Sequence, residues 1–255
     1  MKVDRDLIRQ GSNLVAILAA FGANILANVN PINGASIGEI ANTVFREVAI
    51  VPANYAFAIW GLIYLGLIGL AIYQALPANK SEPRLRKLSY FLAIASLAQI
   101  GWIFLFQYRL FALSVAAMIA ILVPLALLYL RLEIALKSFS VVQKWLVNFP
   151  ISLYFAWISV ATIVNVASAL DAAGWNGWGI SNSLWTAIML SIGAILAAIL
   201  AIRRRDRVYL GVFIWAFIAI AIRQRVSLLI SGTAVGLAIL LLILLLMTPG
   251  QIAKE

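Results

Sequence analysis

The sequence predicts an all-α protein, a polytopic transmembrane helical bundle of about eight spans, and three observations support this fold class. Hydrophobic residues make up 64% of the 255 positions, and charged residues make up only 11%. The hydrophobic residues form runs of about 20 residues, which is the length that a helix needs to cross a bilayer. The charged residues lie between these runs. A soluble domain needs more polar surface than this, so we expect the bilayer to be the solvent.

The expected spans follow one another closely, which leaves no room for a separate aqueous domain. Asp4 and Asp6 precede the first run together with basic residues, unlike a signal peptide, so we expect this run to be retained as a helix. Pro124 lies inside the fourth run and predicts a kink there. The spans are expected at Ser12–Val29, Ala53–Leu76, Leu88–Tyr108, Leu110–Leu130, Trp145–Leu170, Leu184–Ile202, Val208–Ile222 and Val226–Met247.

The seventh span is the shortest of the eight and has arginines at both of its ends. Long arginine side chains can reach the polar interface from the end of a short helix. Arg207, Arg223 and Arg225 are therefore interpreted as interfacial residues, and the run between them is kept as a span.

Two connections stand out. The first covers Asn30–Val51 and includes a weakly amphipathic stretch, which is typical of a short helix in the membrane interface. Long ordered connections often act as lids or binding loops. The other connection, Asp171–Ser183, combines glycines with Trp175 and Trp178, so we expect a loop whose indoles lie among lipid headgroups.

The basic residues predict an orientation. With the N-terminus inside, only four of the 19 Lys and Arg residues fall on the outer side, and the other 15 fall on the inner side. This bias predicts an integral protein of the cytoplasmic (inner) membrane with both termini in the cytoplasm. We interpret the net charge of +10 as anchoring to anionic membrane lipids, with no nucleic-acid partner, because no contiguous basic and aromatic surface is apparent. The outer four are Arg46, Arg109, Arg223 and Arg225.

The composition disfavours catalysis. Cysteine and histidine are both absent, which removes thiol nucleophiles, imidazole bases and the usual ligands of zinc and haem iron. The nine acidic residues all fall in connections or at their edges, so the spans offer neither an acid–base pair nor a proton relay. We therefore expect no enzymatic activity, no catalytic residue, no metal site and no ion coupling.

Aromatic rings and carboxamides are concentrated in three of the expected spans. Trp60 and Tyr64 are four residues apart and share a helix face, as do Trp157, Ala161 and Asn165. One interpretation is a cavity whose aromatic walls stack on a flat ligand. The other is that the rings anchor the helices at the interfaces and the amides join neighbouring helices. Spacing alone leaves both interpretations open.

Three stretches resemble the translocator protein family, also called tryptophan-rich sensory proteins or TspO/MBR. Pro52–Tyr64 resembles the signature of that family's second helix, with Phe57 before Trp60 and Tyr64. Gln99 three residues before Trp102 is similar to the pattern of the third helix. Trp157, Ala161 and Asn165 match the fifth. The departures are a shorter spacing from Phe57 to Trp60, Gln99 where Asn is usual, and an earlier proline at Pro150.

The resemblance covers residues 12–170 and implies a fold of five helices around a ligand pocket, capped by the first connection. It implies one membrane domain in two parts: residues 1–170 as the ligand-binding part, and residues 171–255 as an extension of three helices without a counterpart in five-helix members. The implied ligands are porphyrins and other flat hydrophobic or lipid-like compounds. Carried over by position, the ligand-binding residues are Phe57, Trp60, Tyr64, Gln99, Trp102, Trp157, Ala161 and Asn165.

The function expected from this resemblance is to bind, sense or transport a planar hydrophobic ligand, without a resident cofactor. Without His or Cys, a porphyrin would be held by stacking and shape. One alternative is an uncoupled transporter that uses all eight helices, and another is a structural or assembly protein whose aromatics only pack. The small residues Ser191, Gly193, Ala194, Ala197 and Ala198 fit either a homo-oligomer seam or contact with another helix of the chain.

Overall fold

The computed structural model describes residues 4–137 and 139–248, and within them it consists of helices and connections without a strand. The predicted all-α membrane bundle is confirmed. Short helical elements lie between the long helices: α2 (Ile37–Thr43), α4 (Pro83–Arg86), α7 (Val141–Gln143), η1 (Asn54–Ala58), η2 (Pro77–Asn79), η3 (Lys144–Asn148) and η4 (Gly177–Gly179). The long helices are α1 (Arg5–Val29), α3 (Ile59–Ala75), α5 (Phe91–Gln107), α6 (Phe111–Arg131), α8 (Phe149–Ala172), α9 (Asn182–Arg204), α10 (Arg207–Arg223) and α11 (Leu228–Met247).

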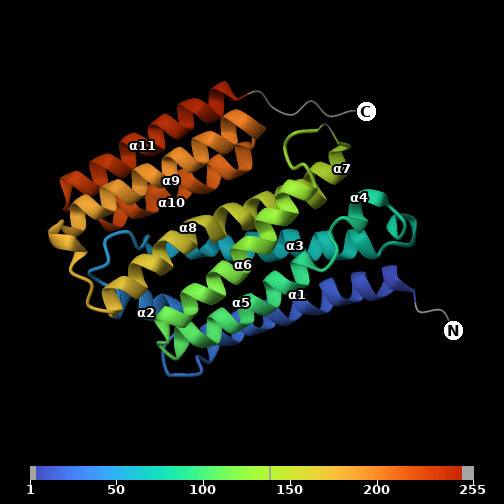
Figure 1. Cartoon of the computed structure of the whole chain (residues 1–255), viewed down its shortest axis with the longest axis horizontal. Helices are drawn as coiled ribbons and strands as arrows, with labels where there is room; N and C mark the ends of the chain where they lie inside the picture. Colours follow the sequence, from blue (N-terminus) through green and yellow to red (C-terminus); the bar gives the residue numbers. More distant parts are fainter. Residues whose placement is uncertain (1–3, 138, 249–255) are drawn as a thin grey trace.

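Seven of the described helical segments are at least 18 residues long and apolar enough to cross a membrane. α10 has 17 residues and falls just below that length. It nevertheless returns the chain from α9 to α11, and the described chain begins and ends at the same end of the bundle (Figure 1). A helix of 17 residues is at the lower limit for spanning the hydrocarbon core, so the run predicted as the seventh span forms a helix whose length is borderline for a span.

The first helix begins about two turns earlier than predicted. The Asp4 carboxylate accepts hydrogen bonds from the backbone N–H groups of Asp6 and Leu7 at 3.2 and 3.3 Å, which caps the helix. The added turns bury Arg9, whose Nη1 donates to the Leu85 carbonyl at 2.9 Å. Sequence reasoning missed these turns because they are polar, although they are packed against the protein.

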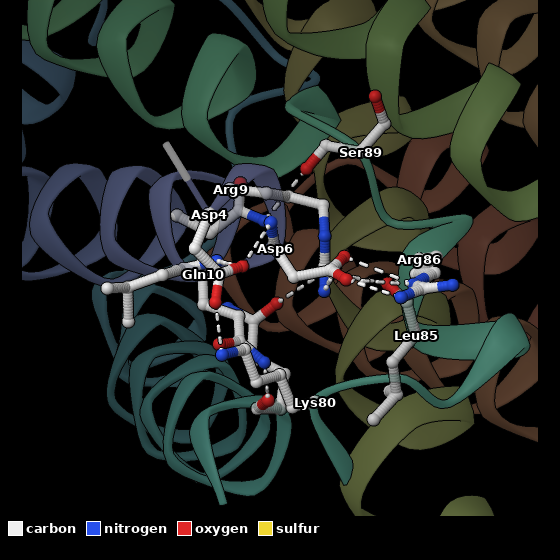
Figure 2. A network of polar contacts seen from close by, with 11 residues as sticks. Asp4, Asp6, Arg9, Gln10, Lys80, Leu85, Arg86 and Ser89 are labelled. Carbon is white, nitrogen blue, oxygen red and sulfur yellow. Dashed lines mark hydrogen bonds and ion pairs between the residues drawn. The ribbon is translucent and has the colours of Figure 1, made fainter. Parts of the chain in front are cut away.

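Charged residues join the start of α1 to the connection between α3 and α5 (Figure 2). Arg86 Nε donates to both carboxylate oxygens of Asp6 at 3.1 Å, and Lys80 pairs with Asp4. The hydrogen bond from Lys80 lowers the pKa of the Asp4 carboxyl below its ordinary value. The start of α1 and the basic connection between α3 and α5 therefore meet at one end of the bundle, which we call the inner end.

Five helices close into a ring. α1 packs against α3 and α5, α3 against α8, and α6 joins α8 to α5. α10 packs against α8 on the outside of this ring, and α9 and α11 pack against α10 (Figure 1). Pro124 lies inside α6, which continues from Phe111 to Arg131.

The small residues of α9 face another helix of the same chain. A Cβ atom at Gly193 would lie 3.3 Å from Cε1 of Phe213, which belongs to α10. Ala197, one turn further along, is fully buried. This face of α9 is therefore occupied by α10.

Gly66 allows the close approach of α3 to α8. A Cβ atom at this position would lie 2.8 Å from Cβ of Pro150, a rigid ring that cannot turn away. We expect Gly66→Ala to lower the free energy of unfolding by about 1–3 kcal/mol through overpacking. Thermal unfolding in detergent measures this loss. Gly61→Ala is the matched control, because nothing lies within 4 Å of its Cβ position, and equal unfolding temperatures for the two variants would contradict the prediction.

Candidate functional site

A small apolar cavity of about 60 Å³ lies inside the five-helix ring, towards the outer end. Its walls come from α3, α5, α6 and α8. Its roof is formed by residues 37–53, that is, by α2 and the segment that follows it, and we call these residues the roof segment. Five residues of the roof segment line the cavity: Ile37, Ala41, Phe45, Val51 and Pro52.

The cavity brings together most of the residues that the family resemblance singles out. Six of the eight line it: Phe57, Trp60, Trp102, Trp157, Ala161 and Asn165. Tyr64 and Gln99 do not line it. They lie deeper in the bundle, where the Trp60 ring stacks on the Tyr64 ring with centroids 5.8 Å apart.

Tyr64 and Gln99 belong to a buried hydrogen-bonded layer that joins four helices. The Tyr154 hydroxyl donates to Oε1 of Gln99 at 2.7 Å, and Nε2 of Gln99 donates to the Tyr64 hydroxyl. The Tyr64 hydroxyl in turn donates to the Ala20 carbonyl of α1 at 3.1 Å. Because buried polar groups that are satisfied in this way fix a packing arrangement, this layer supports the cavity from below.

Asn165 holds one wall of the cavity in place. Trp102 Nε1 donates to Oδ1 of Asn165 at 2.7 Å, and Nδ2 of Asn165 donates to Oγ of Ser114 at 3.0 Å. α5, α6 and α8 are thereby joined around one buried amide, and the Trp102 ring stacks on Phe106 with centroids 5.1 Å apart.

The indole of Trp157 differs from that of Trp102. Trp157 is 2% exposed, and its Nε1 has no hydrogen-bonding partner within the described residues. Its ring lines the cavity and meets the Phe57 ring edge-on at 6.3 Å. A buried donor without an acceptor costs about 1–3 kcal/mol, so this N–H is an unsatisfied group on a residue that lines the cavity.

α10 holds the roof segment through Arg223. Its guanidinium donates to Oδ1 of Asn42 at 2.9 Å and to the Ala41 carbonyl at 3.1 Å, and it reaches the carbonyls of Phe45 and Pro52 at 3.4 and 3.5 Å. This charged donor bridges four acceptors and thereby joins α2 to Phe45 and Pro52 in the segment that follows it.

Further contacts extend this attachment along α10 and to the start of α9. Nε2 of Gln224 donates to the Ala49 carbonyl at 3.0 Å, and Nδ2 of Asn182, at the start of α9, donates to the Glu47 carbonyl at 2.7 Å. Trp215 Nε1 donates to the Ala56 carbonyl in η1 at 3.2 Å. α9 and α10 therefore hold the cover of the cavity.

Sequence reasoning missed this role of Arg223, which was interpreted as an interfacial residue. One signal was present: Arg223 is one of four basic residues on the expected outer side, against the charge bias. No group of three or more His, Cys, Asp or Glu residues that could hold a metal occurs in the described ranges.

The fold and the cavity define a polytopic helical membrane protein with an aromatic chamber under a covering connection. The sequence model of the family described as TSPO-like protein matches residues 10–247, and the chain belongs to this family. The match includes α9, α10 and α11 as well as the five-helix ring. Comparisons with curated proteins and with solved structures find no match.

Proposed function

We propose that this protein binds a planar hydrophobic ligand, of the porphyrin or lipid-like class, between Trp60, Trp102 and Trp157, and that it senses or transports this ligand. The observation that carries the proposal is the convergence of three tryptophans from three helices on one cavity inside the ring. Aromatic faces stack on flat apolar molecules. The unpartnered Trp157 N–H supports recognition of an acceptor atom on the ligand.

The cavity is smaller than a pocket that could hold the proposed ligand. Pockets for small molecules usually have volumes of about 300–1,000 Å³, whereas this cavity has about 60 Å³. We propose that this conformation is a closed state, and that a porphyrin enters only when a wall or the roof moves. We propose that the roof segment moves, because it is a connection outside the helices of the ring and its attachment to α10 consists of side-chain hydrogen bonds.

The chemistry of the chain supports stacking without axial coordination. The sequence has no His or Cys to ligate a metal at the centre of a porphyrin. We propose that metal-free and metal-containing porphyrins bind with similar affinity, and that the chain has a binding role and no catalytic one.

The orientation and the two-part organisation are also proposals. We propose that the inner end faces the cytoplasm, supported by the cluster of Lys80, Arg86 and their partners there. We propose that residues 1–170 form the ligand-binding part and that residues 171–255 stabilise its cover, supported by the Arg223 contacts.

Tryptophan fluorescence tests the binding proposal. In detergent, protoporphyrin should quench the fluorescence saturably, and Trp60→Ala and Trp157→Ala should each weaken its binding about tenfold by removing a stacking face. Trp145→Phe is the control, because Trp145 is 63% exposed and does not line the cavity. Unchanged affinity in both alanine variants would reject this cavity as the site. Protoporphyrin flux into liposomes then separates a transporter from a sensor.

A further inference from the structure

A second and larger cavity, of about 310 Å³, lies at the outer end between the ring and α9. It is bounded by the end of α8, the start of α9 and the loop between them, with Val48 and Ile50 of the roof segment above it. Its volume falls within the usual range for small-molecule pockets. Neither the proposed function nor the family resemblance uses this space.

The two cavities lie on different faces of α8. Ala161, Val164 and Asn165 line the first cavity, whereas Ile163 and Ala167 line the second. Their interleaved positions along one helix separate the cavities by the body of α8. A ligand in the second cavity therefore occupies a site of its own.

The walls of the second cavity are mostly apolar, with two indoles at the outer end. Trp175 and Trp185 contact each other with ring centroids 5.3 Å apart. Trp185 is fixed by a hydrogen bond from its Nε1 to the Gly177 carbonyl at 2.7 Å. Gly177 has a φ of +66°, and a Cβ atom there would lie 3.2 Å from the Trp185 ring, so glycine is required at this contact.

One carboxylate lines this cavity. Asp171, in the last turn of α8, has no hydrogen-bonding or charged partner for its side chain within the part of the chain that the structure describes. It is exposed and lies one residue before the end of α8. The site thus combines an apolar interior, indole faces and a negative charge that lacks a cation.

We propose that this cavity binds an amphiphile with an apolar body and a permanently positive ammonium head. The body lies against Ile163, Ala167 and Met189, and the ammonium pairs with Asp171 beside the face of Trp175. Carboxylates attract cations, and indole faces add a cation–π interaction. An anionic head would instead meet the Asp171 charge, so the site selects against fatty acids and phosphate monoesters.

Tryptophan quenching by brominated amphiphiles in a neutral maltoside detergent tests this proposal. The probes are a brominated alkyl trimethylammonium and a brominated fatty acid of the same chain length. We expect saturable quenching by the ammonium and affinity at least about tenfold lower for the acid. Asp171→Asn should weaken ammonium binding about fivefold, the upper range for a partly exposed charge pair, and leave acid binding unchanged or stronger.

Further variants locate the site. Ala167→Phe fills the second cavity and should abolish saturable ammonium quenching, whereas Ala161→Leu fills the first and should leave it intact. The double variant Trp175→Phe/Trp185→Phe should lose most of the quenching amplitude. Protoporphyrin binding should instead be lost in Ala161→Leu and unchanged in Ala167→Phe. Failure of the proposed function and failure of this site are therefore distinguishable. Equal affinity for the two probes, or unchanged ammonium binding in Asp171→Asn, would overturn the proposal.

Discussion

Replacing Arg223 with Gln is expected to increase amide hydrogen exchange in the roof segment about 30-fold. The substitution removes charge-assisted hydrogen bonds to Asn42 and to backbone carbonyls of the roof. A hydrogen bond to a charged group contributes about 1.5–3 kcal/mol, and about 2 kcal/mol corresponds to this change in the opening equilibrium. Since local opening governs exchange of these amides, mass spectrometry of peptides from residues 37–53 measures the effect directly.

The same substitution should speed the binding of ligand. If the closed cavity cannot hold a porphyrin, a roof that opens more often raises the fraction of protein that can bind it. The association rate constant and the apparent affinity should then both rise, while the dissociation rate constant changes less. Arg225→Gln is the matched control, since Arg225 is two residues away and exposed. Equal amide hydrogen exchange of residues 37–53 in the two variants would show that Arg223 does not hold the roof segment.

Asn165→Ala is expected to destabilise the protein by about 2–3 kcal/mol and to weaken protoporphyrin binding about tenfold. The variant leaves the Trp102 N–H without its acceptor and enlarges the cavity beside it. An unpaired buried donor costs about 1–3 kcal/mol, and the lost side-chain volume adds to this. Thermal unfolding in detergent and fluorescence titration measure the two effects.

Ser114→Ala provides the control for this prediction. It removes one partner of Asn165 but leaves the 2.7 Å hydrogen bond from Trp102. We expect a smaller loss of stability, about 1 kcal/mol, and nearly unchanged binding. A Ser114→Ala variant that binds as weakly as Asn165→Ala would show that general loosening, and not the position of Trp102, controls affinity.

The long helices could be predicted from the sequence because the bilayer imposes a simple requirement on them. Every backbone polar group must be satisfied within the hydrocarbon region, so the long apolar runs appear as helices with ends close to those expected. The start of α1 departs most, because Asp4 caps a polar turn that hydropathy does not detect. α10 is helical as expected, although its length is borderline for a span.

The candidate site could be predicted only in part. Helical spacing places Trp157, Ala161 and Asn165 on one face of α8, and all three line the cavity. Spacing cannot tell whether Tyr64 and Gln99 face the cavity or the layer below it, because both positions lie on the inward side of their helices. Their partners, Tyr154 and the Ala20 carbonyl, are set by tertiary packing.

The attachment of the roof by α10 could not be derived from one sequence. Arg223 contacts residues more than 170 positions earlier, and no local pattern encodes a contact of that range. In the structure the contacts of Arg223, and of Asn182 at the start of α9, give α10 and α9 a physical role that composition left unexplained.

Protoporphyrin titration of a pair of cavity-filling variants tests most directly whether the chamber between Trp60, Trp102 and Trp157 is the ligand site. Ala161→Leu places a larger side chain in the chamber, whereas Ala167→Phe changes the neighbouring cavity on another face of α8. We expect Ala161→Leu to lose saturable protoporphyrin binding and Ala167→Phe to bind like the unmodified protein. Full affinity in a folded Ala161→Leu variant would contradict the claim.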